Sequence, residues 1–430
     1  MELEELSVVE KAAMLSGGSE WDSRGNDRAD IPSFVMSDGP HGVRRQLGEG
    51  DHLGIGASKP ATCFPTAGTV ANSWDPALAE EMGEALGSEA HDLDVNVLLG
   101  PGLNIKRNPL CGRNFEYYSE DPIVAGRMAA GLIRGIQSNG ISACPKHFAV
   151  NSQELRRQAS NSVVDERTMR ELYLTGFEIA VREAKPLTIM TSYNEINGVY
   201  AHENKHLLQE ILRDEWGYEG LVVSDWIGKR NTVAQVHAGN DLMMPGEPAQ
   251  AREIVEAVRS GRLAEADVDR CVTRVLEYIL RTPVSGNKPC RRLPTWKHML
   301  PYRVRWQRKA WFCSATKALL YHLPQDVISR CSESMPMTAL PEVRAPDTST
   351  KPIRSIWTKV CATPDSGLTP VRQISMQNTC LSVRHCSRSR TPCVIWAKVV
   401  CPRNDADAGI HRFACGGQRC GHRCLRPQFG

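Results

Sequence analysis

The sequence lacks several features that assign a protein to a compartment. Its first residues, Met-Glu-Leu-Glu-Glu-Leu, contain neither the basic nor the apolar region of a secretory signal peptide. No apolar run approaches the roughly 20 residues that span a bilayer, and no Asn-x-Ser/Thr glycosylation site occurs. Taken as written, these absences predict a soluble, cytoplasmic chain with no membrane partner. A true N-terminus longer than the one written would instead allow secretion.

Charge and cysteine are distributed unevenly along the 430 residues. Residues 1–284 contain 28 Lys and Arg against 42 Asp and Glu, a formal charge of −14, whereas residues 285–430 contain 24 against 7, a charge of +17. Only 4 of the 15 cysteines lie in the first segment. The first segment is long enough for one barrel-sized domain, typically about 250 residues. We therefore predict a folded domain over residues 1–284 and a separate basic, cysteine-rich tail over residues 285–430.

Short apolar runs alternate with helical patterns up to about residue 281. The predicted strands are Phe34–Ser37, Val95–Leu99, Ile141–Cys144, Leu187–Thr191 and Leu221–Ser224. The predicted helices are Pro76–Leu93, Ile123–Gln137, a helix that begins at Asp165 and stops before Pro186, and Glu265–Leu280. Asp75-Pro76 and Asp121-Pro122 each place an N-cap residue before a first-turn proline. This alternation is typical of βαβ units around a parallel sheet.

The fold class that we predict is α/β, a TIM-like (β/α)8 barrel. No glycine-rich phosphate turn follows the first strand, which disfavours an open, doubly wound nucleotide-binding sheet. Beyond Pro283 neither helical nor strand periodicity is sustained, so the tail is predicted to be unstructured. We find no internal repeat in either segment.

Polar side chains follow the predicted strands at the points where they end. Asp225 and Trp226 end the strand at 221–224, Asp38 ends the first strand, and Lys146 and His147 follow the third. Because parallel strands of a barrel present their C-terminal residues to one face, these side chains are expected to share a site. Met190, Tyr193 and a polar loop that contains Arg113 belong to the same pattern.

Each of these features also has a simpler interpretation. Asp225 is suited to cap the next helix, since Asp is a favoured N-cap residue, and Asp38-Gly39 is suited to a turn. Lys146 and His147 would be a solvated surface pair. Arg113 and Glu116 would pair on a rim, contributing about 0–1 kcal/mol. The occurrence of all four features at strand ends favours a shared site.

Five blocks in this segment resemble one known family. They are SDGPHGVR at 37–44, GRNFEYYSEDP at 112–122, KHFAVN at 146–151, SYNEING at 192–198 and SDW at 224–226. Their order and content identify residues 1–281 as similar to the N-terminal barrel of glycoside hydrolase family 3, close to its β-glucosidases. No Asp-Ser-His block occurs, and Lys146-His147-Phe148 continues with Ala-Val-Asn. Both features differ from the pattern of the family's N-acetylglucosaminidases and therefore disfavour that branch.

The resemblance implies a retaining hydrolase of terminal β-D-glucosyl residues, with no metal and no cofactor. Asp225 would be the nucleophile. The pocket for the nonreducing sugar would be formed by Asp38, Arg113, Lys146, His147, Met190, Tyr193 and Trp226. β-Glucosides or short β-gluco-oligosaccharides would be the substrates. Asp225 must be ionised to attack, and we expect Lys146 or a protonated His147 to lower its pKa.

The second catalytic carboxylate of the family is not found. The resemblance places the acid/base Glu on an α/β sandwich domain after the barrel, yet residues 285–430 do not resemble that domain, and Glu333 and Glu342 are their only glutamates. We expect an out-of-frame tail. A disordered basic extension and a zinc site at Cys415, Cys420, His422 and Cys424 are the alternatives. Activity is therefore expected to be impaired, with a sugar-binding remnant as the rival function and a nucleic-acid-binding protein ranked last.

Overall fold

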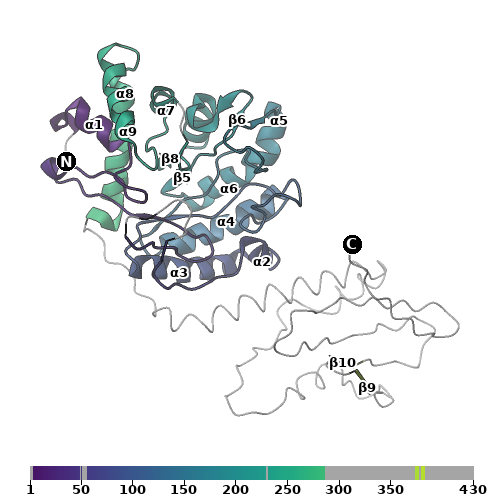
Figure 1. Ribbon diagram of the computed structural model, residues 1–430. Coiled ribbons are helices and arrows are strands. Elements are labelled where there is room, and N and C mark those ends of the chain that lie inside the picture. The colour runs from purple at the N-terminus through teal and green to yellow at the C-terminus, as the bar shows by residue number, and fades with distance from the viewer. Residues whose placement is uncertain are drawn as a thin grey trace. The chain divides into compact units, whose positions relative to one another are not determined.

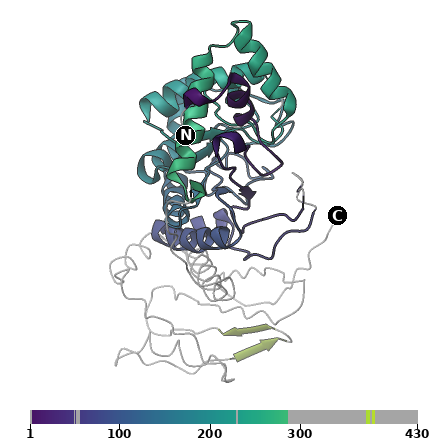
Figure 2. The same ribbon diagram turned by 90° about the vertical axis from the view of Figure 1, so that its left-hand side faces the viewer.

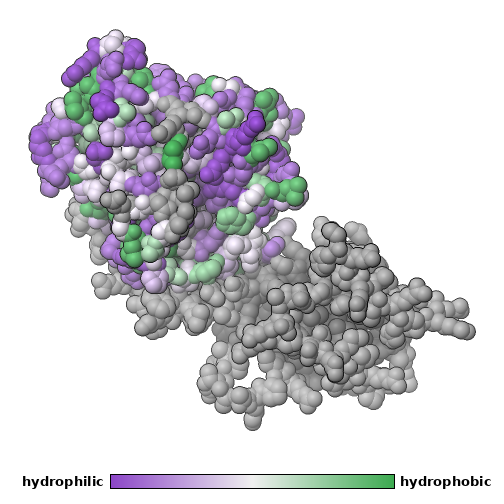
Figure 3. Space-filling view, in the orientation of Figure 1, coloured by the Kyte–Doolittle hydropathy of each residue, from purple (hydrophilic) through white to green (hydrophobic). Residues whose placement is uncertain are grey.

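The computed structural model describes residues 3–48, 50, 56–228 and 231–285, together with the backbone of 373–376 and 379–382. The chain divides into two units, Met1–Pro336 and Met337–Gly430. All the elements that position the predicted site belong to the first unit. The face of this unit seen in Figure 3 is largely hydrophilic, with apolar residues in small separate groups.

Parallel strands form the centre of the first unit. β1 (Met36–Asp38) pairs with β2 (Val97–Leu99), which pairs with β3 (Ser142–Ala143). β5 (Thr188–Met190) pairs in parallel with β8 (Leu221–Val223). Single parallel bridges extend this series, joining Phe148 to Thr191, Val223 to Leu242 and Ser16 to Met243. The five predicted strands are confirmed, each shorter by one or two residues, and the first ends one residue later than predicted, at Asp38.

These strands are buried on both faces, which explains their continuous apolar runs. Successive side chains point to opposite faces of a strand. Ile189 and Val222 accordingly pack in one apolar cluster, while Met190, Leu221 and Val223 pack in the other. The first cluster contains the apolar faces of the helices α3, α4 and α6, and the second those of α1, α8 and α9, so the strands lie between two groups of helices (Figures 1 and 2).

The two longest helices in the first group begin as the sequence predicts. In α3 (Pro76–Asp92) the Asp75 carboxylate accepts the backbone N–H groups of Ala77 and Leu78, and in α4 (Pro122–Gln137) Asp121 does the same for Ile123 and Val124. The two helices cross closely at glycines. A Cβ on Gly135 would lie 2.1 Å from the backbone oxygen of Glu80. Glycine is therefore required for this approach of the two backbones.

The helix predicted from Asp165 differs from the observed one. Asp165 caps it as expected, but α5 (Glu166–Thr168) gives way to a π-helical turn, η3 (Met169–Leu174), before α6 (Thr175–Ala184). A second π-helical segment, η5 (His206–Glu215), precedes β8. Because i→i+5 bonding shifts the apolar stripe by one residue per turn, an α-helical period cannot predict it.

Five further α-helices complete the described part of the first unit. α9 (Glu265–Arg281) confirms the prediction for Glu265–Leu280, while α1 (Val8–Met14), α2 (Ala67–Ala71), α7 (Thr232–Ala238) and α8 (Pro248–Arg259) are not predicted. Short strands β4 (Asn161–Ser162), β6 (Glu195–Ile196) and β7 (Val199–Tyr200) form a separate sheet. Short 3-10 turns are η1 (Leu3–Glu5), η2 (Asp27–Ala29), η4 (Ala201–Glu203) and η6 (Pro283–Ser285).

In the second unit β9 (Gln373–Met376) pairs with β10 (Thr379–Ser382) in an antiparallel hairpin (Figure 1). The sequence predicts no regular element in the tail, and this prediction is wrong for these two strands. The rest of the tail lies outside the described residues, as do Glu333, Glu342 and the alternative zinc ligands Cys415, Cys420, His422 and Cys424.

Candidate active site

The predicted site residues lie at the C-terminal ends of the parallel strands. Asp38 is the last residue of β1, Met190 is the last of β5, and Asp225 and Trp226 follow β8. Lys146 and His147 follow β3, and Arg113 lies in the connection between β2 and α4. Electrostatic contact joins Asp225 to Arg113, Lys146 and Tyr193. Met190 and Trp226 belong to one apolar cluster.

Three of the four simpler interpretations do not account for these side chains, whereas the chain does turn after Asp38-Gly39, where the Gly42 N–H donates to the Gly39 carbonyl at 3.1 Å. Asp225 does not cap the next helix, because α7 is capped by the side chain of Asn231. Lys146 and His147 are buried, with 3% and 1% of their surface exposed, and so are not a solvated pair. Arg113 and Glu116 do pair with each other, but only 4% of the Glu116 side chain is exposed, so the pair is not on a rim.

A buried ammonium group links two carboxylates at the base of the site. Lys146 Nζ donates to Asp38 Oδ1 at 2.8 Å and lies 3.9 Å from Glu116 Oε2. Burial alone would raise the pKa of Asp38, but Lys146 and then Arg44, whose Nη2 is 3.7 Å from Asp38 Oδ2, lower it to about 2. Asp38 is therefore ionised and half-exposed, which leaves it able to accept hydrogen bonds from a ligand.

At Asp225 the effect of burial on the pKa outweighs that of the nearby cations, the opposite of the balance at Asp38. Burial of Asp225 raises its pKa above the ordinary value, while Arg113 and Lys146 partly counteract the effect. Oδ1 accepts the backbone N–H of Trp226 at 2.7 Å, and Oδ2 is 3.7 Å from His147 Nε2. The expected lowering of this pKa is wrong in its net direction, because desolvation outweighs the two cations. A raised pKa makes the carboxylate a stronger base, and hence a better nucleophile once it is ionised.

His147 does not supply positive charge to the site. Burial lowers its pKa well below the ordinary range, and Arg113 and Lys146 lower it further. The prediction that a protonated His147 would stabilise ionised Asp225 is therefore wrong: the imidazole is neutral. Its Nδ1 lies 3.2 Å from the Tyr117 hydroxyl, and its backbone N–H and C=O are both bound by the Asn104 amide. These contacts orient the ring toward Asp225.

Aromatic groups form the remaining walls. Trp226 donates its indole N–H to the Glu20 carbonyl at 2.8 Å. The pKa of the Tyr193 phenol is raised by burial and by the nearby Asp225 carboxylate, so the phenol stays protonated and can donate a hydrogen bond. The guanidinium of Arg157 lies 4.8 Å above the Tyr193 ring. A ring with hydroxyls on its edge and apolar C–H groups on its faces fits such a mixed surface.

Five residues of this site are not predicted as functional from the sequence. Glu116, Tyr117 and Arg44 stand inside the motif blocks, so their proximity to the predicted residues along the chain was the available signal. Asn104 and Arg157 follow no motif pattern. They reach the site because the loops after β2 and β3 fold over the strand ends, which periodicity does not reveal.

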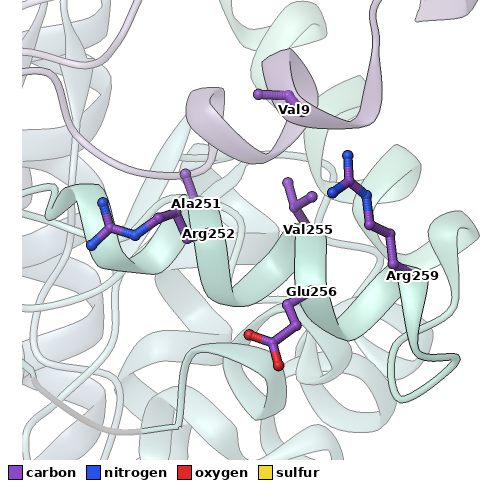
Figure 4. A pocket seen from close by; sticks show the side chains of 6 residues that line it. All are labelled: Val9, Ala251, Arg252, Val255, Glu256 and Arg259. Atoms are coloured by element: carbon purple, nitrogen blue, oxygen red, sulfur yellow. The ribbon is translucent and has the colours of Figure 1, made fainter.

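Two surface hollows lie elsewhere on the first unit. One, lined by Val9, Ala251, Arg252, Val255, Glu256 and Arg259, lies between α1 and α8 (Figure 4). The other is lined by side chains of η5 and α9 and by Tyr218 and Glu219. Neither includes a predicted site residue. Within the described segments no cluster of three or more His, Cys, Asp or Glu side chains is placed to hold a metal ion, and no helix is long and apolar enough to cross a membrane.

Comparison with known proteins identifies the relatives of this domain. The sequence profile of the glycosyl hydrolase family 3 N terminal domain matches residues 9–278. Thermostable beta-glucosidase B of Acetivibrio thermocellus is 48% identical over 278 residues, which are 64% of this chain and 37% of that protein. The exo-alpha-(1->6)-L-arabinopyranosidase of Bifidobacterium breve is 44% identical over 284 residues, 65% of this chain and 37% of that protein.

Solved structures give the same result. Beta-glucosidase 3B from Thermotoga neapolitana, determined in complex with glycerol, has a TM-score of 0.65 and 38% identity over 73% of this chain and 46% of that one. The same enzyme with alpha-D-glucose gives a TM-score of 0.65 over 72% of this chain and 45% of that one, again at 38% identity. The chain thus spans less than half the length of these relatives. With its profile match, its strand-end site and these neighbours, the chain belongs to glycosyl hydrolase family 3.

Proposed function

We propose that residues 1–284 form a retaining glycosidase domain in which Asp225 attacks the anomeric carbon of a terminal β-D-glucosyl residue. The observation that carries this proposal is the buried Asp225 carboxylate under the electrostatic influence of Arg113 and Lys146, the same Lys146 that binds an ionised, part-exposed Asp38. The ionised carboxylate forms the C–O bond to the sugar as the aglycone leaves. Water then hydrolyses the glycosyl ester.

The sugar would be held by the polar groups that surround the nucleophile. Asp38 accepts hydrogen bonds from adjacent hydroxyls, and Lys146 and His147 donate or accept at the same edge. Arg113 is the largest cationic influence on Asp225, and hence favours its ionised form. Met190, Tyr193 and Trp226 would contact the faces of the ring. No metal or cofactor takes part in this chemistry.

A closed barrel is the architecture that we propose for this domain. Parallel neighbours follow one another in chain order through β1, β2, β3, β5 and β8, and the last one, around Met243, pairs with Ser16 near the beginning of the chain. A series of parallel strands whose last member pairs with a segment near the beginning of the chain fits a closed (β/α)8 barrel. It fits an open sheet less well, because the strand order of an open sheet reverses at a switch point.

We propose that this domain lacks its general acid, because each described carboxylate near the site has a cationic partner. Among the described carboxylates near the site, Asp38 is bound to Lys146, Glu116 to Arg113, and Glu154 to Arg157 at 3.0 Å. Asp38, which Lys146 keeps ionised, is a poor proton donor, and the other two carboxylates are bound by arginines. Loss of general acid assistance costs about 10²–10⁴-fold, so we expect turnover of activated aryl glucosides but poor hydrolysis of disaccharides.

Trapping the intermediate tests this assignment. A fluorinated glucoside with a good leaving group should add one glucosyl unit to the tryptic peptide that contains Asp225. Asp38→Ala should prevent labelling by weakening sugar binding. Label on another residue, or none on a folded sample, would contradict the proposal. Because one relative is an exo-alpha-(1->6)-L-arabinopyranosidase, the corresponding fluorinated α-L-arabinopyranoside is a useful second reagent. Faster labelling by that reagent would mean that the pocket prefers an arabinopyranosyl residue to a glucosyl residue.

A further inference from the structure

A second tryptophan, Trp21, packs against Trp226, which is a proposed wall of the sugar pocket. The ring centroids of Trp21 and Trp226 are 5.1 Å apart with an interplanar angle of 36°, within the range of favourable aromatic pairs. Trp21 is buried, and its indole N–H donates to Gln46 Oε1 at 2.6 Å. Trp226 is fixed at its own indole N–H by the Glu20 carbonyl. The position of one indole therefore limits the position of the other.

Trp21 is in turn held by a hairpin that follows the Asp38 block. Its two arms, residues 45–48 and 56–59, are joined by the Gln46–Ser58 bridge and by a hydrogen bond from the Leu47 N–H to the Ala57 carbonyl. Gly50 lies directly against the indole: a Cβ there would be 2.7 Å from Trp21 Cδ1, 2.9 Å from Nε1 and 3.0 Å from Gln46 Oε1. There is no room for a side chain at this contact.

We propose that Trp21 is a positioning residue, which transmits the position of Gly50 and Gln46 to Trp226 and thereby sets the affinity of the pocket for its sugar. The inference rests on the proposed function, since it takes Trp226 to be a wall of that pocket. It assigns no contact with the sugar to Trp21. A purely structural role would affect the stability of the domain without affecting its affinity for glucose.

The hairpin contains its own matched control. Gly48 and Gly50 have almost the same backbone, with φ of +75° and +76°, so alanine is strained equally at both. A Cβ at Gly48 meets nothing within 4 Å, whereas a Cβ at Gly50 meets Trp21. Comparison of Gly50→Ala with Gly48→Ala therefore offsets the cost of the positive φ and leaves the contacts with the indole and with Gln46 Oε1.

The experiment measures glucose binding to the full chain by calorimetry, with the far-ultraviolet circular dichroism couplet of the indole pair recorded on the same samples. We expect Gly50→Ala to weaken binding by about two- to tenfold relative to Gly48→Ala, the range of one aromatic pair, and to reduce the couplet. Trp21→Phe, which keeps a ring but loses the bond to Gln46, should fall between Gly50→Ala and the wild type.

Each result decides the matter. Equal affinities and couplets for the two alanine variants, with glucose bound by the wild type, would overturn the positioning role and leave the proposed function standing. A lowered Tm for Gly50→Ala with unchanged affinity would overturn it as well. If the folded wild type binds no glucose and takes up no glucosyl label, the proposed function fails, and the positioning role fails with it.

Discussion

Replacement of Asp241 by Asn should destabilise the domain severely. Asp241 is fully buried, and its Oδ2 accepts from Arg213 Nη2 at 2.7 Å and from the backbone N–H of Val222 at 2.9 Å. Its Oδ1 accepts from Arg274 Nη1 at 3.0 Å. One carboxylate thus joins β8, η5 and α9, directly below the strand end that presents Asp225.

The magnitude follows from the two cations that the change leaves behind. The amide of Asn carries no charge, and its NH2 group would face a guanidinium that is itself a donor. Removal of one partner from a buried ion pair costs about 3–5 kcal/mol. For a domain of this size about 2–4 °C of Tm is lost per kcal/mol, so we expect Tm to fall by roughly 6–20 °C.

Thermal and urea unfolding of the full chain, followed by circular dichroism, would measure this effect. The matched control is Glu178→Gln. This change breaks an exposed ion pair between residues one helical turn apart, in which Arg182 Nε lies 2.8 Å from Glu178 Oε1. Exposed helical pairs contribute about 0.3–0.5 kcal/mol, so the control should unfold within about 2 °C of the wild type. If Asp241→Asn were as stable as this control, the buried network would not hold the strand, and the reasoning would be refuted.

Three further outcomes follow from the charged groups of the site. The rate of the burst from an aryl glucoside should fall at acid pH through the raised pKa of Asp225, and Arg113→Met should move that limb to higher pH, because Arg113 is the main cation that opposes burial. Lys146→Met should weaken glucose binding by about 10–100-fold in calorimetry, as expected if Lys146 donates a charged hydrogen bond to the sugar. In urea unfolding, the wild type should have a larger free energy of unfolding than Asp38→Asn at pH values above 3.8, the ordinary pKa of the carboxyl in the unfolded chain. This difference should disappear as the pH falls toward 2, because the folded-state pKa of Asp38 is lowered to about 2.

The main elements were predictable because their signals are local. Strands buried on both faces give uninterrupted apolar runs, as in Leu221–Val223. Asp75 and Asp121 mark the starts of α3 and α4 with a cap and a proline. α8 gave only half of this signal: it begins with a first-turn proline, Pro248, but Glu247 before it is not among the favoured N-cap residues. α7 is only seven residues long, too short for its periodicity to stand out.

The grouping of the site residues at the strand ends was predictable from the sequence, but their charge states were not. Asp38, Lys146 and Asp225 each lie at or after the end of a strand. Because the C-terminal ends of parallel strands lie at one face, these residues share that face whatever side chains pack around them. The neutral state of His147 and the raised pKa of Asp225 depend on burial and on the distance to Arg113, neither of which sequence spacing specifies. For the same reason Arg157, brought over Tyr193 by a folded loop, could not be predicted.

The central claim is that Asp225 is a nucleophile in a working sugar pocket. Its most direct test is the burst of phenol from an aryl β-glucoside with a good leaving group, compared between the wild type and Asp225→Ala. Asp267→Asn, which alters a carboxylate paired with His237 and Arg270, serves as the control. We predict about one equivalent of phenol from the wild type and the control, followed by slow turnover, and none from Asp225→Ala. An equal burst from all three, or no burst from a folded wild type, would contradict the account.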